Sequence, residues 1–143
     1  MFHIAFVEDN PSEILLTKVT CEDLKFTVEE KVTFFEDEVS ILKTLDENQN
    51  LFDLIFLDVN IGNISGFDVL RMFRQRKLLT PVFMYSNSNN PNDLENSKLL
   101  NASGYIQKPY EYENMRNLIQ LIRTSLNNKS IETLIKSKVN LLN

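Results

Sequence analysis

The amino-acid sequence predicts an α/β fold, in which five parallel strands form one doubly wound sheet with helices on both faces. Short apolar segments alternate with longer segments whose apolar residues repeat at helical spacing, which gives the order βαβαβαβαβα between residues 2 and 126. Residues 54–57 are apolar without interruption, as expected of a strand covered on both faces. We therefore expect right-handed crossovers and the common flavodoxin-like strand order 2-1-3-4-5.

The composition is that of one globular domain. The 143 residues can bury a single core, and a hydrophobic fraction of 43% with 24% charged residues excludes a wholly disordered or fibrous chain. The net charge is -5 and there is no concentrated basic face, so nucleic-acid binding is not expected. We expect a soluble, cytoplasmic protein without a membrane partner. The chain has a single cysteine (Cys21), lacks a basic leader and contains no apolar run near ~20 residues.

The first helix has a clear start. Residues 2–7 form an apolar strand that ends at two acids, and Asn10 then provides a cap residue, with Pro11 at the first helical position. Glu13 stands three residues after the cap, where its carboxylate could accept from the Asn10 amide. Residues 26–34 follow as a strand, because β-branched and aromatic residues alternate there.

The remaining elements continue the alternation. Their expected ranges are 36–47 (helix), 53–58 (strand), 66–75 (helix), 81–85 (strand), 91–101 (helix), 104–107 (strand) and 111–126 (helix). The first of these helices carries Val39, Leu42 and Leu45 at helical spacing, and Pro81 stands at the first position of its strand, where proline is tolerated.

Carboxylates end two strands that the predicted order makes neighbours. The first strand ends in Glu8 and Asp9, and the third ends in Asp58. Ligands of such sheets bind beyond the carboxyl ends of the strands, where the strand order reverses. Like charges gathered there need a counter-ion, and hard oxygen ligands suit Mg²⁺. The alternative, that each acid is a solvated loop residue, explains one acid more easily than three.

A hydroxyl and an ammonium follow the other two strands of this edge. Ser86 comes directly after the fourth strand and Lys108 after the fifth. Either residue alone is an ordinary surface feature. Together, opposite a metal ion, they are the groups that would bind a tetrahedral anion.

These segments resemble a known family. VEDN at 7–10, LDVN at 57–60, the turn at Gly66, PVFMYS at 81–86 and ASGYIQKPY at 102–110 are similar to the receiver domain of two-component response regulators. The closest likeness is to stand-alone receivers that partner phytochrome-type histidine kinases. The resemblance implies a receiver domain over residues 1–126, followed by a C-terminal helical extension at 127–143.

The resemblance also implies roles for individual residues. Asp58 would be the phosphoacceptor, with Asp9, Asp58 and the backbone carbonyl of Asn60 as Mg²⁺ ligands and Glu8 acting through a water. Lys108 and Ser86 would contact the phosphoryl oxygens, and the Lys108–Pro109 bond would be cis. After phosphorylation Ser86 would move and Tyr105 would turn inward. The alternative for Tyr105 is a half-buried aromatic residue whose hydroxyl stays in water.

The implied function is that of a single-domain response regulator, a phosphoprotein of phosphorelay signal transduction. It would take a phosphoryl group from a histidine kinase or phosphotransfer protein and signal to a downstream protein through the face of the fourth helix, fifth strand and fifth helix. It would be no enzyme beyond its own aspartyl phosphorylation and dephosphorylation. A receiver-like scaffold that binds partners without phosphorylation is the alternative. A flavin phosphate would be repelled by Glu8 and Asp9, and a phosphatase would need an acid where Asn60 stands.

Three features lie outside this pattern. Gly62 occupies a position where several family members carry proline, which predicts a more mobile loop. His3 is expected to pack near the start of the first strand, away from the crevice.

The extension carries an apolar helical stripe made of Ile131, Leu134, Ile135, Val139 and Leu142. Folding back onto the domain, packing across a homodimer and disorder all remain open for it.

Overall fold

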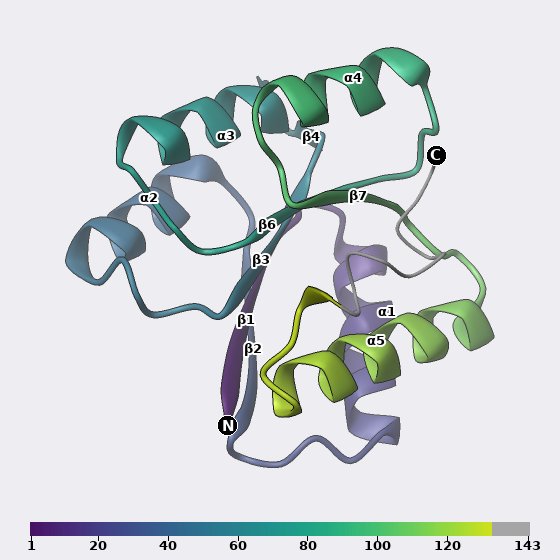
Figure 1. Ribbon diagram of the computed structural model, residues 1–143. Helices are drawn as coiled ribbons and strands as arrows, with labels where there is room; N and C mark the ends of the chain where they lie inside the picture. The colour runs from purple at the N-terminus through teal and green to yellow at the C-terminus, as the bar shows by residue number, and fades with distance from the viewer. Residues whose placement is uncertain (133–143) are drawn as a thin grey trace.

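A single parallel sheet forms the centre of the protein (Figure 1). The computed structural model describes residues 1–132. The strand order is β2-β1-β3-β6-β7, and each neighbouring pair is parallel, which confirms the predicted order. These strands are β1 (Phe2–Val7), β2 (Glu30–Phe35), β3 (Leu54–Asp58), β6 (Val82–Ser86) and β7 (Gly104–Gln107).

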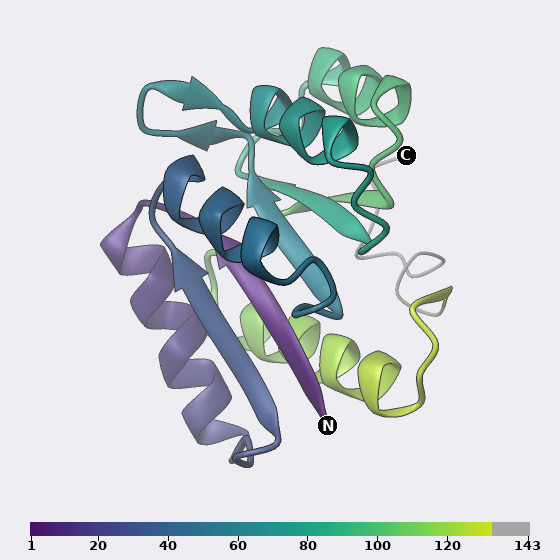
Figure 2. The ribbon, with the colours of Figure 1, turned by 90° about the vertical axis from the view of Figure 1, so that its left-hand side faces the viewer.

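Helices cover both faces of the sheet, as the prediction requires. Figures 1 and 2 show α2, α3 and α4 on one side and α1 and α5 on the other. The helices are α1 (Pro11–Asp23), α2 (Glu38–Glu47), α3 (Gly66–Gln75), α4 (Pro91–Leu99) and α5 (Tyr112–Asn127). In the described part of the chain, no helix combines the length and the apolar character needed to cross a bilayer.

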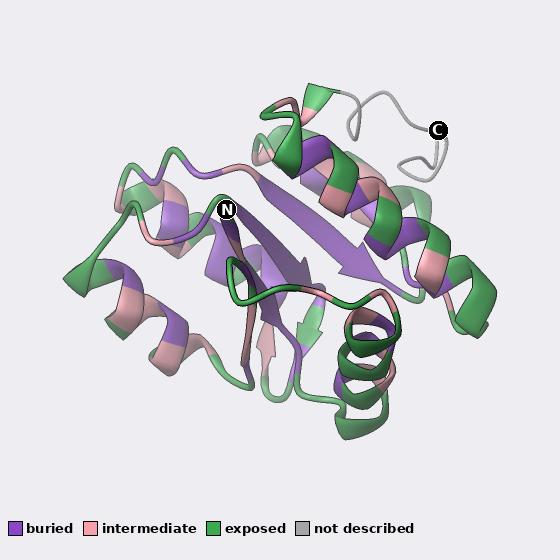
Figure 3. Cartoon of the chain, turned by 90° about the horizontal axis from the view of Figure 1, so that it is seen from below, coloured by how far each residue is buried: buried purple, intermediate pink, exposed green. Residues whose placement is uncertain are grey.

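The central strand β3 is buried along its whole length (Figure 3). Its side chains alternate between two hydrophobic clusters, with Ile55 and Leu57 facing α2 and α3, and Leu54 and Phe56 facing α1 and α5. This double burial explains why the segment is apolar without alternation. Asp58, the last residue of β3, is also buried.

Several element boundaries differ from the sequence prediction. β2 begins at Glu30 because residues 26–29 turn the chain back, with Lys25 at φ 56° and the Glu30 amide donating to the Thr27 carbonyl. In α2 the buried residues are Ile41 and Leu45, whereas Val39 is exposed.

A short hairpin follows Asp58 that the sequence prediction did not include. β4 (Asn60–Ile61) pairs antiparallel with β5 (Ile64–Ser65), and Gly62 lies in the turn between them. Two-residue strands carry too few side chains for alternation to be recognised in the sequence. The greater mobility that Gly62 predicts for this loop stays a prediction.

The chain leaves α5 through a turn in which Lys129 has φ 54°. The Ile131 side chain then packs, partly buried, against the cluster beneath α1 and α5. The remaining residues of the predicted stripe lie outside the described residues. His3 packs as expected: its ring lies 4.7 Å from the Phe52 ring, centre to centre, and its Nε2 atom is 2.6 Å from the Thr33 hydroxyl oxygen.

Candidate functional site

Parallel pairing brings the carboxyl ends of the strands to one edge of the sheet. Val7 pairs with Leu57, so Glu8 and Asp58 end neighbouring strands, and Ser86 pairs with Gln107, directly before Lys108. A pocket of about 280 Å³ lies at this edge. Six of its lining residues were singled out from the sequence as site residues: Glu8, Asp9, Asp58, Asn60, Ser86 and Lys108. Its other lining residues are Asn10, Glu13, Asn87 and Ser88.

Asp58 stands at the base of this pocket, where its two carboxylate oxygens accept different donors. The Asn60 amide donates to Oδ1 at 3.1 Å, and Lys108 Nζ donates to Oδ2 at 2.9 Å. Gly66 packs against the backbone behind it, because a Cβ atom at Gly66 would lie 1.9 Å from the Asp58 carbonyl oxygen. The start of α3 can approach β3 this closely only without a side chain at that position.

Lys108 is the cationic centre of the pocket. Its side chain is 5% exposed, and its three ammonium hydrogens are directed at three carboxylates, those of Glu8, Glu13 and Asp58. Burial acts to lower the pKa of Lys108, but hydrogen bonds to Glu13 and Glu8 outweigh it and hold the pKa above its usual value. The ammonium ion is therefore the form that these contacts stabilise.

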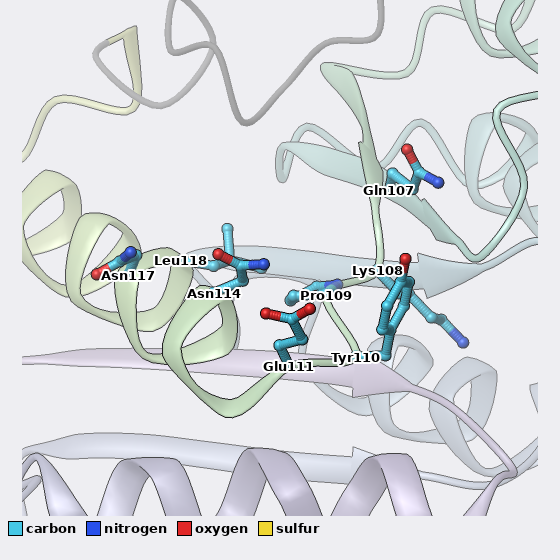
Figure 4. A pocket seen from close by; sticks show the side chains of 8 residues that line it. All are labelled: Gln107, Lys108, Pro109, Tyr110, Glu111, Asn114, Asn117 and Leu118. Carbon is cyan, nitrogen blue, oxygen red and sulfur yellow. The ribbon is translucent and has the colours of Figure 1, made fainter.

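The predicted cis bond between Lys108 and Pro109 is wrong, since the bond is trans. Trans is the ordinary preference of X–Pro bonds by about 0.5–1 kcal/mol. In Figure 4 the Lys108 side chain points away from α5, whereas Pro109, Tyr110 and Glu111 lead into that helix. Those three residues, together with Lys108, line a second hollow of about 410 Å³ beside α5. The Lys108 side chain thus extends into the Asp58 pocket although the peptide bond after Lys108 is trans.

The predicted capping box at the start of α1 does not form, because Glu8 takes the bond that was expected of Glu13. The Asn10 side chain caps α1 by accepting from the amides of Ser12 and Glu13, as predicted. The Asn10 amide, however, donates to Glu8 Oε1 at 3.1 Å, so the predicted bond from Asn10 to Glu13 is wrong. The Glu13 carboxylate instead accepts from Lys108 at 2.6 Å and from the Asn87 side-chain amide at 3.2 Å.

Glu13 is therefore a pocket residue that the sequence reasoning assigned to helix capping. A signal for it existed: side chains in the first turn of a helix point back towards the helix start, and α1 starts at the site. Burial, together with the hydrogen bond shared with Glu13, raises the pKa of Glu8 above its usual value. Burial also acts to raise the pKa of Glu13, but hydrogen bonds with Glu8 and Lys108 lower it overall.

Asp9 is exposed and takes a different partner from the other acids. Its Oδ2 atom accepts from the Gly62 amide at 2.9 Å, across the mouth of the pocket. Among the described residues, the tight group of carboxylate oxygens within 4.8 Å of one another contains Glu8, Glu13 and Asp58 but not Asp9. Gly62 has φ +57°, a conformation that suits glycine, so this residue shapes the loop and also supplies the donor.

Ser86 and Tyr105 both contact the loop between β6 and α4. The buried Ser86 hydroxyl oxygen accepts from the Ser88 amide at 3.1 Å, and the Tyr105 hydroxyl donates to the Ser88 carbonyl at 2.7 Å. Tyr105 is 4% exposed. The alternative of a half-buried tyrosine with its hydroxyl in water is therefore wrong. The ring already lies inward without a phosphoryl group, so an outward position from which it would turn is not seen, and the switch role stays a prediction.

Comparisons with known proteins agree on one family. A family model described as the response regulator receiver domain matches residues 4–120. The sensory transduction protein BceR of Halalkalibacterium halodurans is 27% identical over 132 residues, which is 92% of this chain and 54% of that protein. The two-component response regulator ORR22 of Oryza sativa is 31% identical over 108 residues, 75% of this chain and 15% of that protein. The chain thus spans about half or less of these relatives.

A solved structure gives a closer match in length. The phosphorylated cyanobacterial phytochrome response regulator RcpA has a TM-score of 0.78 and 26% identity, over 90% of this chain and 96% of that chain.

Proposed function

The chain belongs to the response regulator receiver family, and on this premise we propose that it is a signalling module of a two-component system, operated by phosphorylation of Asp58. The observation that carries the proposal is the contact between the buried Asp58 carboxylate and Lys108, in a pocket that also holds Glu8, Asp9 and Ser86. The similar structure of RcpA is described as phosphorylated, which agrees with this reading.

In the proposed reaction an Asp58 oxygen forms a bond to phosphorus, while the bond from phosphorus to the histidine nitrogen of the donor protein breaks. The product is an acyl phosphate on Asp58, and the leaving nitrogen keeps the electron pair of the broken bond. Lys108 would pair with the phosphoryl oxygens, and the Ser86 hydroxyl would donate to one of them. Positioning and charge neutralisation supply most of the catalysis in such transfers.

The oxygen donors of the pocket fit a divalent cation such as Mg²⁺. Glu8, Glu13 and Asp58 bring three carboxylates together around a single ammonium, which leaves an excess of negative charge and only hard ligands. The ligands we propose are those that the family resemblance implies: Asp9, Asp58 and the Asn60 carbonyl directly, and Glu8 through a water. Asp9 would turn from the Gly62 amide to bind the cation. A bound cation would neutralise charge on the phosphoryl oxygens.

The signal would pass through the loop between β6 and α4. A phosphoryl group on Asp58 offers new acceptor oxygens, so it would draw the Ser86 hydroxyl away from the Ser88 amide. Because Tyr105 holds the Ser88 carbonyl of the same loop, its position would change with the loop. We propose that a downstream protein reads this change on the face formed by α4, β7 and α5, and that a histidine kinase or phosphotransfer protein is the donor.

The test is incubation with Mg²⁺ and acetyl phosphate, followed by intact mass measurement. Wild type should gain one phosphate-sized mass and Asp58→Asn should not. Asp68→Asn is the matched control, because Asp68 is an exposed aspartate of α3 that pairs only with Arg71 among the described residues. If wild type gains no mass while the control protein is folded, the proposal fails and the phosphorylation-independent scaffold is favoured.

A further inference from the structure

We propose that Glu13 is a positioning residue of this site, which holds Lys108 and Asn87 together and competes with a phosphoryl group on Asp58 for the Lys108 ammonium. The inference rests on the proposed function and adds a residue to it. Three elements meet at this carboxylate: the first turn of α1, the segment after β7 and the loop between β6 and α4.

The geometry shows that Lys108 has no donor to spare. Its ammonium lies 2.6 Å from Glu13 Oε2 and 2.9 Å from Asp58 Oδ2, and it also donates to Glu8 Oε2. An ammonium ion has three hydrogens. A further acceptor near Asp58 can therefore be served only if one of these three carboxylates gives up its hydrogen bond.

Exposure indicates which carboxylate gives way. The side chains of Glu8 and Asp58 are 4% and 9% exposed, whereas that of Glu13 is 25% exposed. An ionised carboxylate left without its partner costs less free energy where water can reach it than where it is buried. Of the two glutamates, Glu13 is thus the one whose carboxylate water can solvate once Lys108 leaves it.

Asn87 connects this exchange to the loop that the proposed signal uses. Its side-chain amide donates to Glu13 Oε1 at 3.2 Å, and its backbone follows Ser86 directly. The next residue, Ser88, is the one held by the Ser86 hydroxyl and by Tyr105. Glu13 therefore holds the first residue of the loop, and Tyr105 holds the next. When Lys108 leaves Glu13, the charge that the Asn87 side chain faces changes.

Two variants separate this role from a general effect of charge. Glu13→Gln keeps the shape and an acceptor for Asn87 but removes the charge that binds Lys108. Glu38→Gln is the matched control, because Glu38 is also a half-buried acid in the first turn of a helix, α2, and makes no ion pair among the described residues. Both substitutions remove one negative charge near a helix start, so effects on helix stability are shared.

The first measurement is the amide NMR spectrum of each protein without added ligand. The Asn87 side-chain amide signals should be displaced in Glu13→Gln and should coincide with those of wild type in Glu38→Gln. Unchanged Asn87 signals in Glu13→Gln would show that Glu13 does not hold this group, and the inference would be overturned.

The second measurement is a titration with beryllofluoride, a phosphoryl mimic, at a Mg²⁺ concentration that saturates wild type and both variants. Glu13→Gln should reach half-saturation at a concentration about three- to tenfold lower than wild type, because one competing charge is lost. Glu38→Gln should match wild type. Equal or weaker binding by Glu13→Gln overturns the competition. If wild type and both variants fail to bind beryllofluoride, the proposed function fails and the competition with it, while the first measurement still decides whether Glu13 holds Asn87.

Discussion

Asp58 is 7% exposed, and a carboxylate buried to this degree costs free energy unless donors meet it. The Asn60 amide and the Lys108 ammonium are these donors, one for each oxygen. The Asn60 amide lies two residues along the chain, whereas the strand order brings Lys108 to the end of β3. These two hydrogen bonds therefore stabilise the charge at the end of the buried strand. They also orient the Asp58 carboxylate into the pocket.

Gly66 should be intolerant of any side chain. A Cβ atom there would lie 1.9 Å from the Asp58 carbonyl oxygen, and this neighbour is backbone that cannot rotate away. We expect Gly66→Ala to lower the free energy of unfolding by about 3 kcal/mol, measured by urea denaturation. A loss below about 0.5 kcal/mol, the range of ordinary surface substitutions, would show that the turn is not packed this tightly.

Gly62 should show a smaller and different effect. Its φ of +57° disfavours other residues, but an added Cβ would meet only Asp9 Oδ2, at 3.8 Å. Gly62→Ala should therefore cost about 1 kcal/mol of unfolding free energy, from backbone strain alone. Gly62→Pro should cost more, because the ring fixes φ at about −65° and the amide that donates to Asp9 is lost. Equal stability of the two variants would show that the loop can leave the φ of +57° without loss.

Five pocket residues could be found from the sequence because each ends a strand or follows one within two residues: Glu8, Asp9, Asp58, Ser86 and Lys108. The sixth, Asn60, came only from the family resemblance. Glu13 could not be assigned in the same way. The pattern of Asn10 and Glu13 fits a capping box, and only the nearby Lys108 ammonium, 95 residues away in the sequence, draws the carboxylate elsewhere. The trans bond before Pro109 was missed because the expectation came from a family resemblance and not from a local signal.

At the scale of elements, the hydrophobic pattern predicted the main strands and helices. A predicted boundary was wrong where side chains from other elements determine where the element begins. The turn at residues 26–29 is an example. Glu30 accepts from the Thr27 amide and from Arg123 of α5, so a distant helix helps to fix where β2 begins. A single sequence carries no direct sign of such a pairing.

This Glu30–Arg123 pair should make stability depend on pH. Hydrogen bonds from Arg123 lower the pKa of Glu30 to about 2, below the value of about 4.3 in an unfolded chain. The stabilisation is therefore fully present above pH ~4.3 and is lost as the pH falls towards 2. Glu30→Gln should lower the unfolding free energy at pH 7 by about 2–3 kcal/mol.

Urea denaturation at several pH values measures this effect. Wild type should lose stability between pH 4.5 and 2 more steeply than Glu30→Gln. Glu29→Gln is the control, since the neighbouring Glu29 is exposed and should leave the profile unchanged. Parallel profiles for wild type and Glu30→Gln would contradict the assignment.

At the scale of the whole molecule, one topological feature positions every group of the site. Because the order β2-β1-β3-β6-β7 reverses between β1 and β3, the loops after these strands diverge and leave a pocket between them. The same order places Ser86 and Lys108 beside it. The fold could be predicted because alternation of strands and helices leaves few possible topologies, and the site could be predicted because it follows from the topology.

The excess of carboxylates should make the whole molecule respond to Mg²⁺. A ligand that binds only the folded state stabilises it by about 2.7 kcal/mol at one hundred times its Kd. We expect Mg²⁺ to raise the melting temperature of wild type and of Asp68→Asn, and to raise that of Asp9→Asn less at the same concentration. An equal rise in all three proteins would show that Asp9 is not a ligand.

The central claim is that Asp58 receives the phosphoryl group, and the most direct measurement is the location of the acyl phosphate. The protein is treated with Mg²⁺ and acetyl phosphate and then with borohydride, which reduces an acyl phosphate to an alcohol, and the modified residue is found by peptide mass spectrometry. The account predicts a modification at position 58 alone. Modification at Glu8, Asp9 or Glu13, or at no residue, would contradict it.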